Sequence, residues 1–423
     1  MLQLNFIRKN RDQVVDRLKI RGIEAAEIVG SIIDLDERLR KTKRESEELA
    51  AQSNASAKKI GELMREGKRE EAEGYKQKSA GYKVKIKSLT DELSQLEDQL
   101  NEKLYQLPNL PHVSVPAGQS DEDNEVVLEK GGYPDLEQEA LPHWELAEKY
   151  NIIDLETGVK VTGSGFPVYK GKGAKLQRAL VQFFLDQAVG QGYTEVQVPI
   201  LVNETSAFST GQLPDKEGQM YHVGEDDLYI IPTSEVPITN MYRDDIINAE
   251  DFPIKHCGYT PCFRREAGSY GTHVRGLNRL HQFDKVELVQ IVHPDKSYNT
   301  LEEMSAYAQS LLEKLDLPYR VLRLCGGDLG FTAALTYDME VYSAAQKRWL
   351  EVSSVSNFET FQTNRLKTRF RNEEGKTTLA HTLNGSALAL PRIVAALLEN
   401  NQNEKGIRIP DILIPYTGFE WID

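Results

Sequence analysis

The chain has 423 residues, of which 40% are hydrophobic and 27% are charged, and its formal net charge is −14. This composition is typical of a globular protein and excludes a collagenous or largely disordered chain, while the length predicts two or three domains. No apolar run reaches the length of a membrane span or of a signal peptide, and three cysteines exclude a disulfide framework, so a soluble cytoplasmic protein is expected.

The charge is unevenly distributed along the chain. Residues 40–90 contain 14 Lys and Arg against 8 Glu, a charge of +6, so the rest of the chain carries −20. A net charge of −14 argues against a protein that binds nucleic acid with its whole surface. A basic segment within an acidic chain instead predicts one local contact with an acidic partner, for which RNA is the leading candidate.

The basic region also has the clearest periodicity. Apolar and small residues follow a 4-3-4-3 spacing over residues 28–63 and again over 72–100, as at the seam of a coiled coil. Gly67 is the only strong helix breaker near the midpoint. Seam positions lie at equal distances on either side of it, which predicts an antiparallel helical hairpin over about residues 28–104. A dimerising coiled coil or a pair of bundle helices with a solvated charged face is the alternative.

A change of composition follows the predicted hairpin. Residues 107–118 contain three prolines and a glycine, cannot continue a helix and are interpreted as a linker. Beyond them the pattern mixes strand-like runs, such as residues 228–231, with helical stretches, such as residues 174–189. We therefore expect a helical domain over residues 1–106 and one α+β domain, built on a mainly antiparallel sheet flanked by helices, over 119–423.

Two candidate motifs do not fit their patterns. The glycine-rich residues 163–173 differ from a P-loop in spacing and lack its magnesium-binding hydroxyl. Cys257 and Cys262 have no second pair at zinc spacing, so buried thiols are expected rather than a zinc site.

Residues 261–287 show a nucleotide-binding pattern: a strand, a polar loop that contains Arg275 and Arg279, and a second strand. Alternate strand positions share one face of a sheet. That face would carry Arg264, Glu266, Phe283 and Glu287. A guanidinium for phosphate, a carboxylate for an exocyclic amine and an aromatic ring for stacking are what a nucleotide requires. A salt-bridged surface β-ribbon is the alternative.

Three segments together resemble the class II aminoacyl-tRNA synthetases. Residues 261–287 resemble motif 2 of that family, residues 192–201 resemble motif 1, and residues 384–398 resemble motif 3, with Arg392 at the position of its arginine. In the family, motif 1 forms the interface of a homodimer and the motif 3 arginine binds the γ-phosphate of ATP. The three motifs occur in the family's order.

Further features resemble bacterial seryl-tRNA synthetases over essentially the whole chain. These are the basic hairpin, the linker and the runs at residues 351–357 and 381–386; residues 232–235 are shared with threonyl and prolyl enzymes. The resemblance implies a ligase that activates L-serine with ATP as seryl-adenylate and transfers serine to tRNA(Ser). In the family, the hairpin recognises the long variable arm of this tRNA, which tRNA(Sec) shares.

The resemblance also implies roles for individual residues. Arg264 and Arg392 are the expected catalytic residues. The residues expected to bind L-serine are Thr233, Ser234, Glu235, Arg264, Glu287, Asn384 and Ser386. The residues expected to bind ATP are Arg264, Arg265, Glu266, Phe283, Glu351, Val352, Ser353, Ser354 and Arg392. Glu351 and Ser354 would provide oxygen ligands for Mg²⁺.

Three other functions remain open at this point. A threonyl- or prolyl-type synthetase would share motifs 1 to 3. A carrier-protein ligase would use an adenylate without tRNA, but such relatives lack the basic hairpin. A coiled-coil interaction protein would keep the fold without the activity.

Overall fold

The computed structural model describes residues 1–134, 136, 140–215, 217–266 and 274–423, which form two compact units. The first unit consists of residues 2–19 and 23–108, and the second consists of Met1 and residues 20–22 and 109–423. The boundary at 108/109 falls inside the predicted linker. Among the described residues, no helix is both long and apolar enough to cross a membrane.

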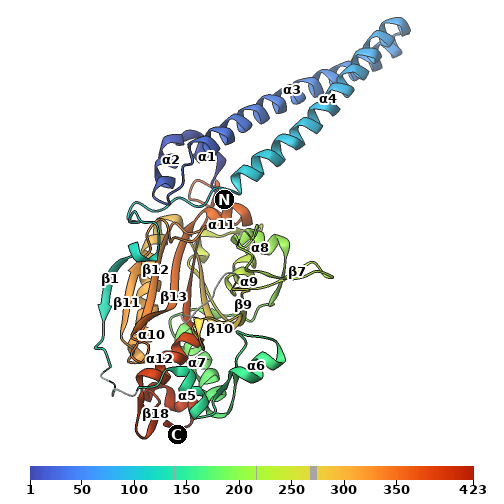
Figure 1. Ribbon diagram of the computed structural model, residues 1–423. Helices are drawn as coiled ribbons and strands as arrows, with labels where there is room; N and C mark the ends of the chain where they lie inside the picture. The colour runs from blue at the N-terminus through green and yellow to red at the C-terminus, as the bar shows by residue number, and fades with distance from the viewer. Residues whose placement is uncertain (135, 137–139, 216, 267–273) are drawn as a thin grey trace. The chain divides into compact units, whose positions relative to one another are not determined.

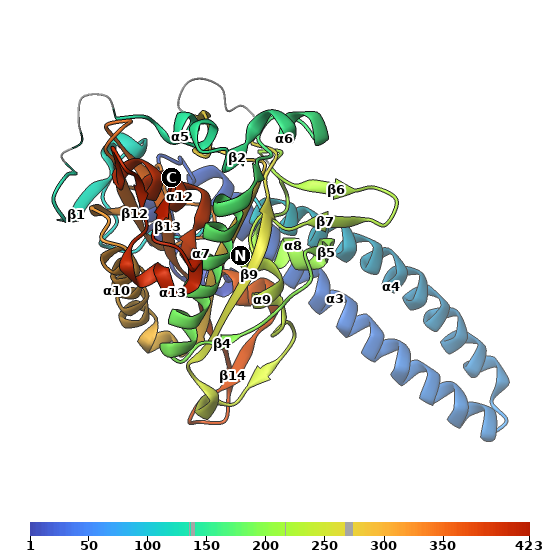
Figure 2. The ribbon, with the colours of Figure 1, turned by 90° about the horizontal axis from the view of Figure 1, so that it is seen from below.

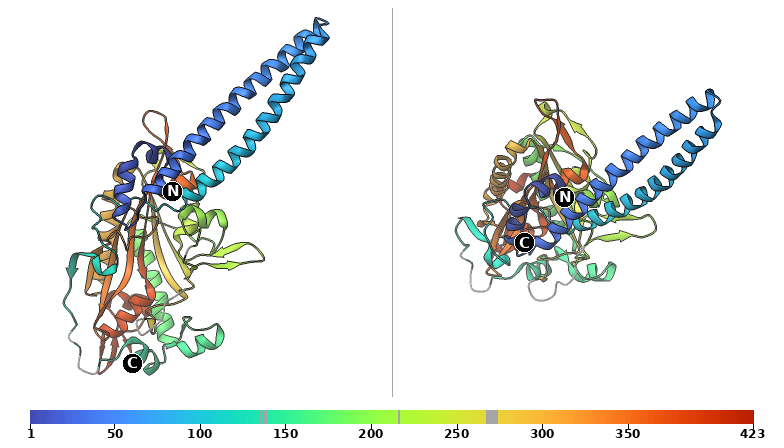
Figure 3. Two further views of the ribbon diagram at one scale, coloured as in Figure 1. Left: turned by 45° about the horizontal axis from the view of Figure 1, so that its top comes forward. Right: turned by 90° about the horizontal axis from the view of Figure 1, so that it is seen from above.

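The first unit is a helical hairpin with two short helices at its base (Figure 1). Its helices are α1 (Leu4–Lys9), α2 (Arg11–Lys19), α3 (Ala26–Arg65) and α4 (Arg69–Leu104). At about 1.5 Å per residue, the 40 residues of α3 extend about 60 Å. Both views of Figure 3 show α3 and α4 side by side along this length.

The spacing of the seam explains how the two long helices meet. Every predicted seam position is buried or half-buried, and almost all other positions between residues 40 and 100 are exposed. Gly67 makes the turn with φ of 77°, a left-handed conformation that glycine adopts without strain. Asp36, which is 3% exposed, accepts from Arg8 at 3.2 Å and from Arg40 at 2.9 Å. The antiparallel hairpin predicted from the sequence is therefore confirmed.

The second unit is built on an eight-stranded sheet with the order β1-β11-β12-β13-β16-β10-β9-β4. All neighbouring strands are antiparallel except β4 and β9. The strands are β1 (Glu125–Lys130), β4 (Thr194–Glu195), β9 (Ile254–Phe263), β10 (Gln282–Val292), β11 (Tyr319–Arg323), β12 (Leu335–Ser343), β13 (Arg348–Glu359) and β16 (His381–Ala389). This architecture confirms the predicted α+β class.

Helices cover one face of this sheet (Figure 2). The helices of this unit are α5 (His143–Lys149), α6 (Leu155–Val161), α7 (Gly171–Gly190), α8 (Glu204–Thr210), α9 (Glu235–Asn240), α10 (Ser297–Lys314), α11 (Phe361–Leu366), α12 (Leu390–Asn400) and α13 (Ile414–Thr417). Apolar residues of α7, α10 and α12 pack with Val286 and Leu288 of β10 and with Leu383 and Ala387 of β16 in one core. Lys285 and Glu287 of β10 and Asn384 and Ser386 of β16 alternate with these apolar residues and lie on the opposite face of the sheet, which leaves that face for a site.

Smaller sheets complete the unit. They contain β15 (Thr377–Leu379), β14 (Arg369–Arg371) and β8 (Ile246–Ile247); β17 (Gln402–Asn403), β18 (Gly406–Arg408) and β19 (Trp421–Ile422); β2 (Ile153–Asp154) and β3 (Val168–Tyr169); and β5 (Leu201–Asn203), β7 (Leu228–Ile230) and β6 (Tyr221–Val223). The β5–β7–β6 sheet leads into residues 232–235 and therefore places them beside the polar face of the large sheet.

Candidate active site

A cavity of about 620 Å³ lies on the polar face of the sheet. Thirteen of the fifteen site residues expected from the sequence line it: Thr233, Glu235, Arg264, Glu266, Phe283, Glu287, Glu351, Val352, Ser353, Ser354, Asn384, Ser386 and Arg392. They come from the start of α9 and the residues just before it, from β10, β13 and β16, and from the first turn of α12. Arg264 and Glu266 follow the end of β9 at Phe263, so the prediction that they alternate along a strand is wrong. Residues up to 159 positions apart thus surround one space.

Two expected residues lie outside the cavity lining. Ser234 is fully buried, and its hydroxyl faces the main-chain oxygen of Gly258 at 3.5 Å. Arg265 directs its guanidinium to the ring of Tyr221, 6.0 Å from its centroid. Part of the expected motif 2 loop, residues 267–273, lies outside the described residues.

A buried cluster of charged side chains forms one end of the cavity. Glu287 forms an ion pair with Lys285 at 2.5 Å and accepts from the side-chain amide of Asn384 at 2.9 Å. The ammonium of Lys285 also donates to the hydroxyl of Thr233 at 2.9 Å. Burial raises the pKa of Glu287, although Lys285 opposes this shift.

Glu235 is a second buried carboxylate in this cluster. Its Oε1 accepts from the amide of Gln362 at 2.6 Å, and Gln362 in turn accepts from the hydroxyl of Thr382 at 2.7 Å. Burial, followed by the nearby charge of Glu287, raises the pKa of Glu235 to about 7. The two carboxylates therefore have fewer positive partners than they need, which suits the binding of a cation.

An arginine and an aromatic ring lie together at the end of the β9–β10 hairpin. The guanidinium of Arg264 stands over the ring of Phe283 at 5.2 Å from its centroid, and both side chains are open to the cavity. Glu266 follows in the left-handed region, with φ of 50°, and its carboxylate accepts from Arg279. Phosphate charge and a flat ring system could therefore be bound side by side.

Arg392 contributes a second guanidinium from the first turn of α12. Its Nε donates to the main-chain oxygen of Asn278 at 3.0 Å, and its Nη1 donates to the main-chain oxygen of Glu351 at 2.7 Å. The Glu351 carboxylate lies 3.5 Å from Nη1. The guanidinium is thus directed by two main-chain acceptors, and the helix N-terminus beside it also favours an anion.

Oxygen donors beside Arg392 suit a divalent cation. Oδ1 of Asp338 is buried without a hydrogen-bond partner, and Asp338 pairs with Ser354 in the register of β12 and β13. Burial, followed by the charge of Glu351, raises the pKa of Asp338 well above its usual value. A cation that takes a few carboxylate oxygens and keeps waters, such as Mg²⁺, fits these groups. The fit depends on the carboxylates of Glu351 and Asp338 and the hydroxyl of Ser354, since no group of three or more His, Cys, Asp or Glu suited to a metal occurs within the described ranges.

Sequence reasoning missed three residues of the site: Lys285, Asp338 and Gln362. Lys285 lies midway between Phe283 and Glu287 at the same strand alternation, a signal that was present in the sequence. Asp338 is likewise a polar residue alternating with apolar ones in β12. Gln362 had no such signal, because its partner Glu235 is 127 residues away.

Comparison with known proteins decides the family. Residues 1–111 match the model of the seryl-tRNA synthetase N-terminal domain, and residues 220–401 match that of the tRNA synthetase class II core domain (G, H, P, S and T). A serine–tRNA ligase of Salinibacter ruber is 54% identical over 99% of this chain and 98% of its own. The chain belongs to the serine–tRNA ligase family.

Other relatives of the ligase agree with this assignment. A serine–tRNA ligase of Prosthecochloris aestuarii is 46% identical over 100% of this chain and 99% of its own. Among solved structures, the seryl-tRNA synthetase of Pyrococcus horikoshii complexed with ATP superposes with a TM-score of 0.93 at 34% identity and covers 100% of this chain and 99% of that one. A prolyl-tRNA synthetase of Giardia lamblia shares the fold alone, with a TM-score of 0.56 at 15% identity. The threonyl- or prolyl-type alternative and the non-enzyme alternative are therefore wrong.

Proposed function

We propose that this ligase works in two steps: L-serine and ATP give seryl-adenylate and pyrophosphate, and the seryl group then passes to tRNA(Ser). One observation carries the proposal: a single cavity contains Arg264 over Phe283, the Glu287–Lys285 cluster and Arg392. Two cationic groups for phosphates and a buried acidic end for an ammonium are what the first step requires. The relative from Pyrococcus horikoshii was crystallised with ATP, which supports a nucleotide in this cavity.

ATP would lie between the two arginines. The adenine ring would stack on Phe283, with its amino group toward Glu266, and Val352 and Ser353 would lie beside the nucleotide. Arg264 would bind the α-phosphate, and Arg392 would bind the γ-phosphate. The role of Arg265, whose side chain lies outside the cavity lining, stays a prediction.

Serine would occupy the buried acidic end. Its ammonium would contact Glu235 and Thr233, and its hydroxyl would contact Glu287, Asn384 and Ser386, with Ser234 supporting this segment. A buried carboxylate that has lost its hydroxyl partner is unfavourable by about 1 to 3 kcal/mol, so alanine would be rejected. Lys285 holds Glu287 in the orientation that this contact needs.

The chemical step needs alignment more than acid–base help. A carboxylate oxygen of serine attacks the α-phosphorus, the bond to pyrophosphate breaks, and the leaving group carries the electron pair away. Arg264 neutralises charge at the α-phosphate and Arg392 holds the leaving group in line. Glu351 and Ser354, with Asp338 behind them, would hold Mg²⁺, which would offset charge on the phosphate oxygens.

The second step requires tRNA and two further interfaces. We propose that the hairpin of α3 and α4 binds tRNA(Ser), and also tRNA(Sec) where an organism has one, because it carries the basic segment of an acidic chain. We also propose a homodimer formed through motif 1, residues 192–201, because apolar side chains are exposed there.

The experiment that tests the first step is ATP–pyrophosphate exchange with each of the twenty amino acids. We expect exchange with serine only, and a loss of at least about a hundredfold in Arg264→Ala, as when one group that stabilises transition-state charge is removed. Arg371→Ala, at an exposed position of β14, is the control and should exchange normally. Serine-dependent exchange that survives in Arg264→Ala would contradict the role of Arg264.

A further inference from the structure

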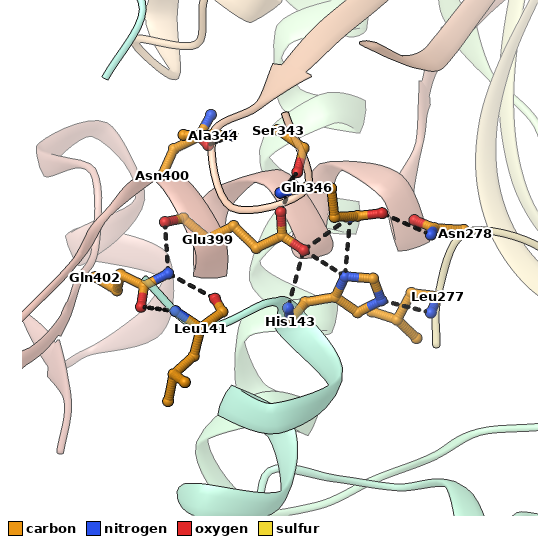
Figure 4. Close-up of polar contacts among 10 residues, drawn as sticks. All are labelled: Leu141, His143, Leu277, Asn278, Ser343, Ala344, Gln346, Glu399, Asn400 and Gln402. Carbon is orange, nitrogen blue, oxygen red and sulfur yellow. Dashed lines mark hydrogen bonds and ion pairs between the residues drawn. The ribbon is translucent and has the colours of Figure 1, made fainter. Parts of the chain in front are cut away.

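A second group of polar side chains lies outside the proposed substrate contacts (Figure 4). Most of them are buried, and Gln346 is half-buried. The centre of the group is His143, at the start of α5, and Glu399, near the end of α12, which are 1% and 0% exposed. Ser343, the last residue of β12, and Gln346, in the turn that follows it, complete the group. Burying several polar groups together destabilises a protein unless each of them is hydrogen-bonded. The segments that these hydrogen bonds connect therefore indicate the role of the group.

The carboxylate of Glu399 is the common acceptor of this group. Its Oε1 accepts from the main-chain N–H of His143 at 2.9 Å and from the amide of Gln346 at 2.8 Å, and lies 2.6 Å from Nδ1 of His143. Its other oxygen accepts from the hydroxyl of Ser343. Burial alone would raise the pKa of Glu399, but the hydrogen bonds from His143 and Ser343 lower it. The ionised carboxylate of Glu399 therefore connects α12 to the start of α5 and to the end of β12 with the turn that follows it.

His143 also forms a hydrogen bond with the main chain at the end of the motif 2 loop. Its Nε2 accepts from the main-chain N–H of Leu277 at 2.8 Å, so the ring proton is on Nδ1 and faces Glu399. Gly276 passes so close that a Cβ on it would lie 2.2 Å from Nε2. The imidazole thus holds the chain at Gly276 and Leu277 in one position.

Gln346 extends the group to Asn278 and from there to the cavity. The amide of Asn278 donates to Oε1 of Gln346 at 2.9 Å, and the main-chain oxygen of Asn278 accepts from Nε of Arg392 at 3.0 Å. Arg392 and Glu399 are on the same helix, so the hydrogen bonds form a closed path through Gln346 and Asn278. The main-chain oxygen of Asn278, which accepts from Arg392, is therefore held in position by Gln346 and His143, and neither of these side chains lines the cavity.

We propose that His143, Gln346 and Glu399 are positioning residues: they fix Leu277 and Asn278 so that the main-chain oxygen of Asn278 aims Arg392 at ATP. The inference rests on the proposed role of Arg392 in ATP binding. Replacing any of these three side chains should therefore weaken the binding of ATP and leave the binding of serine unchanged.

The test is Gln346→Met in serine-dependent ATP–pyrophosphate exchange with the full-length enzyme. Loss of the hydrogen bonds that join Gln346 to Glu399 and Asn278 should raise the KM for ATP about five- to tenfold and leave the KM for serine within about twofold. In an Arg392→Ala background, Gln346→Met should add little, because residues that act through one group are not additive. Ser343→Ala, which removes a donor to Glu399 with little change in volume, should shift the KM for ATP in the same direction.

Gln402→Met is the matched control. Gln402 makes two hydrogen bonds to the main chain of Leu141, at 2.7 and 2.8 Å, and donates to the main-chain oxygen of Glu399 at 2.9 Å, but it makes none to the Glu399 carboxylate or to residues 276–278. It should lower Tm about as much as Gln346→Met while leaving the KM for ATP unchanged. Equal KM values for ATP in wild type, Gln346→Met and Ser343→Ala, or an equal rise in Gln402→Met, would overturn the inference. Absence of serine-dependent exchange in wild type would instead overturn the proposed function.

Discussion

At the scale of single residues, the acidic end of the cavity is short of positive charge. Glu235 and Glu287 are both buried, and the ammonium of Lys285 forms an ion pair with Glu287. Burial raises the pKa of both carboxyl groups despite Lys285 and the more distant Arg264. A ligand ammonium would complete the neutralisation, so the proposed binding of serine at this end of the cavity would relieve the electrostatic strain between the two carboxyl groups.

This strain gives the enzyme a measurable pH dependence. Because the pKa of Glu235 rises from 4.5 to about 7 on folding, the folded state binds more protons than the unfolded state between these values, and the carboxyl group becomes destabilising as pH rises. Glu235→Gln removes this effect. We expect the variant's stability relative to wild type to improve by about 2 kcal/mol from pH 5.5 to 8.

Unfolding of the unliganded proteins, followed by circular dichroism at both pH values, provides the measurement. Glu250→Gln, an exposed carboxylate, should show no such difference. If Glu235→Gln and wild type change in parallel with pH, Glu235 is not strained in the way that the structure indicates.

At the scale of elements, the features that could be predicted from the sequence are those with a regular spacing within one helix or strand. The seam of α3 and α4 could be predicted because a coiled coil repeats its contacts at a fixed spacing. The polar face of β10 could be predicted because strand alternation is equally local. The bonds of Gln362 to Glu235 and of Asn278 to Gln346 could not, since they join elements 127 and 68 residues apart.

The exposed lysines of α4 provide a test of the proposed binding of tRNA by the hairpin of α3 and α4. Lys83, Lys85 and Lys87 point away from the seam, so Lys→Gln at all three should leave the hairpin folded. We expect this variant to bind tRNA(Ser) more weakly. In a plot of the logarithm of affinity against the logarithm of salt concentration, the slope should become shallower by about 0.7 to 0.9 for each lost phosphate contact. Filter binding at several salt concentrations measures both, and serine-dependent pyrophosphate exchange should be unchanged.

The matched control neutralises acidic residues on the same helix. Glu→Gln at Glu70, Glu71 and Glu73, which are also exposed, should leave tRNA binding equal or tighter. Wild-type affinity and salt slope in the lysine variant would show that these lysines do not contact the tRNA.

At the scale of the whole molecule, the large sheet of the second unit has no strand beyond β4 in the part of the chain that the structure describes. The strand order ends at β4, a two-residue strand within motif 1. A groove of about 270 Å³ there is lined by α7 together with Glu195 and Tyr259. Val189, Ile200 and Leu201 are exposed in the same stretch of chain, at 48%, 39% and 42%. A second copy of the chain would cover these apolar groups and continue the edge.

Ile200→Glu tests this assembly. In the proposed homodimer the new carboxylate would be buried without a partner, which weakens association by at least about a hundredfold. Light scattering after size exclusion should give twice the chain mass of 47.8 kDa for wild type and a single chain for the variant. Val161→Glu, at a more exposed apolar position of α6, should remain dimeric. A wild type that is monomeric, or an Ile200→Glu variant that dimerises as wild type does, would exclude motif 1 as the interface.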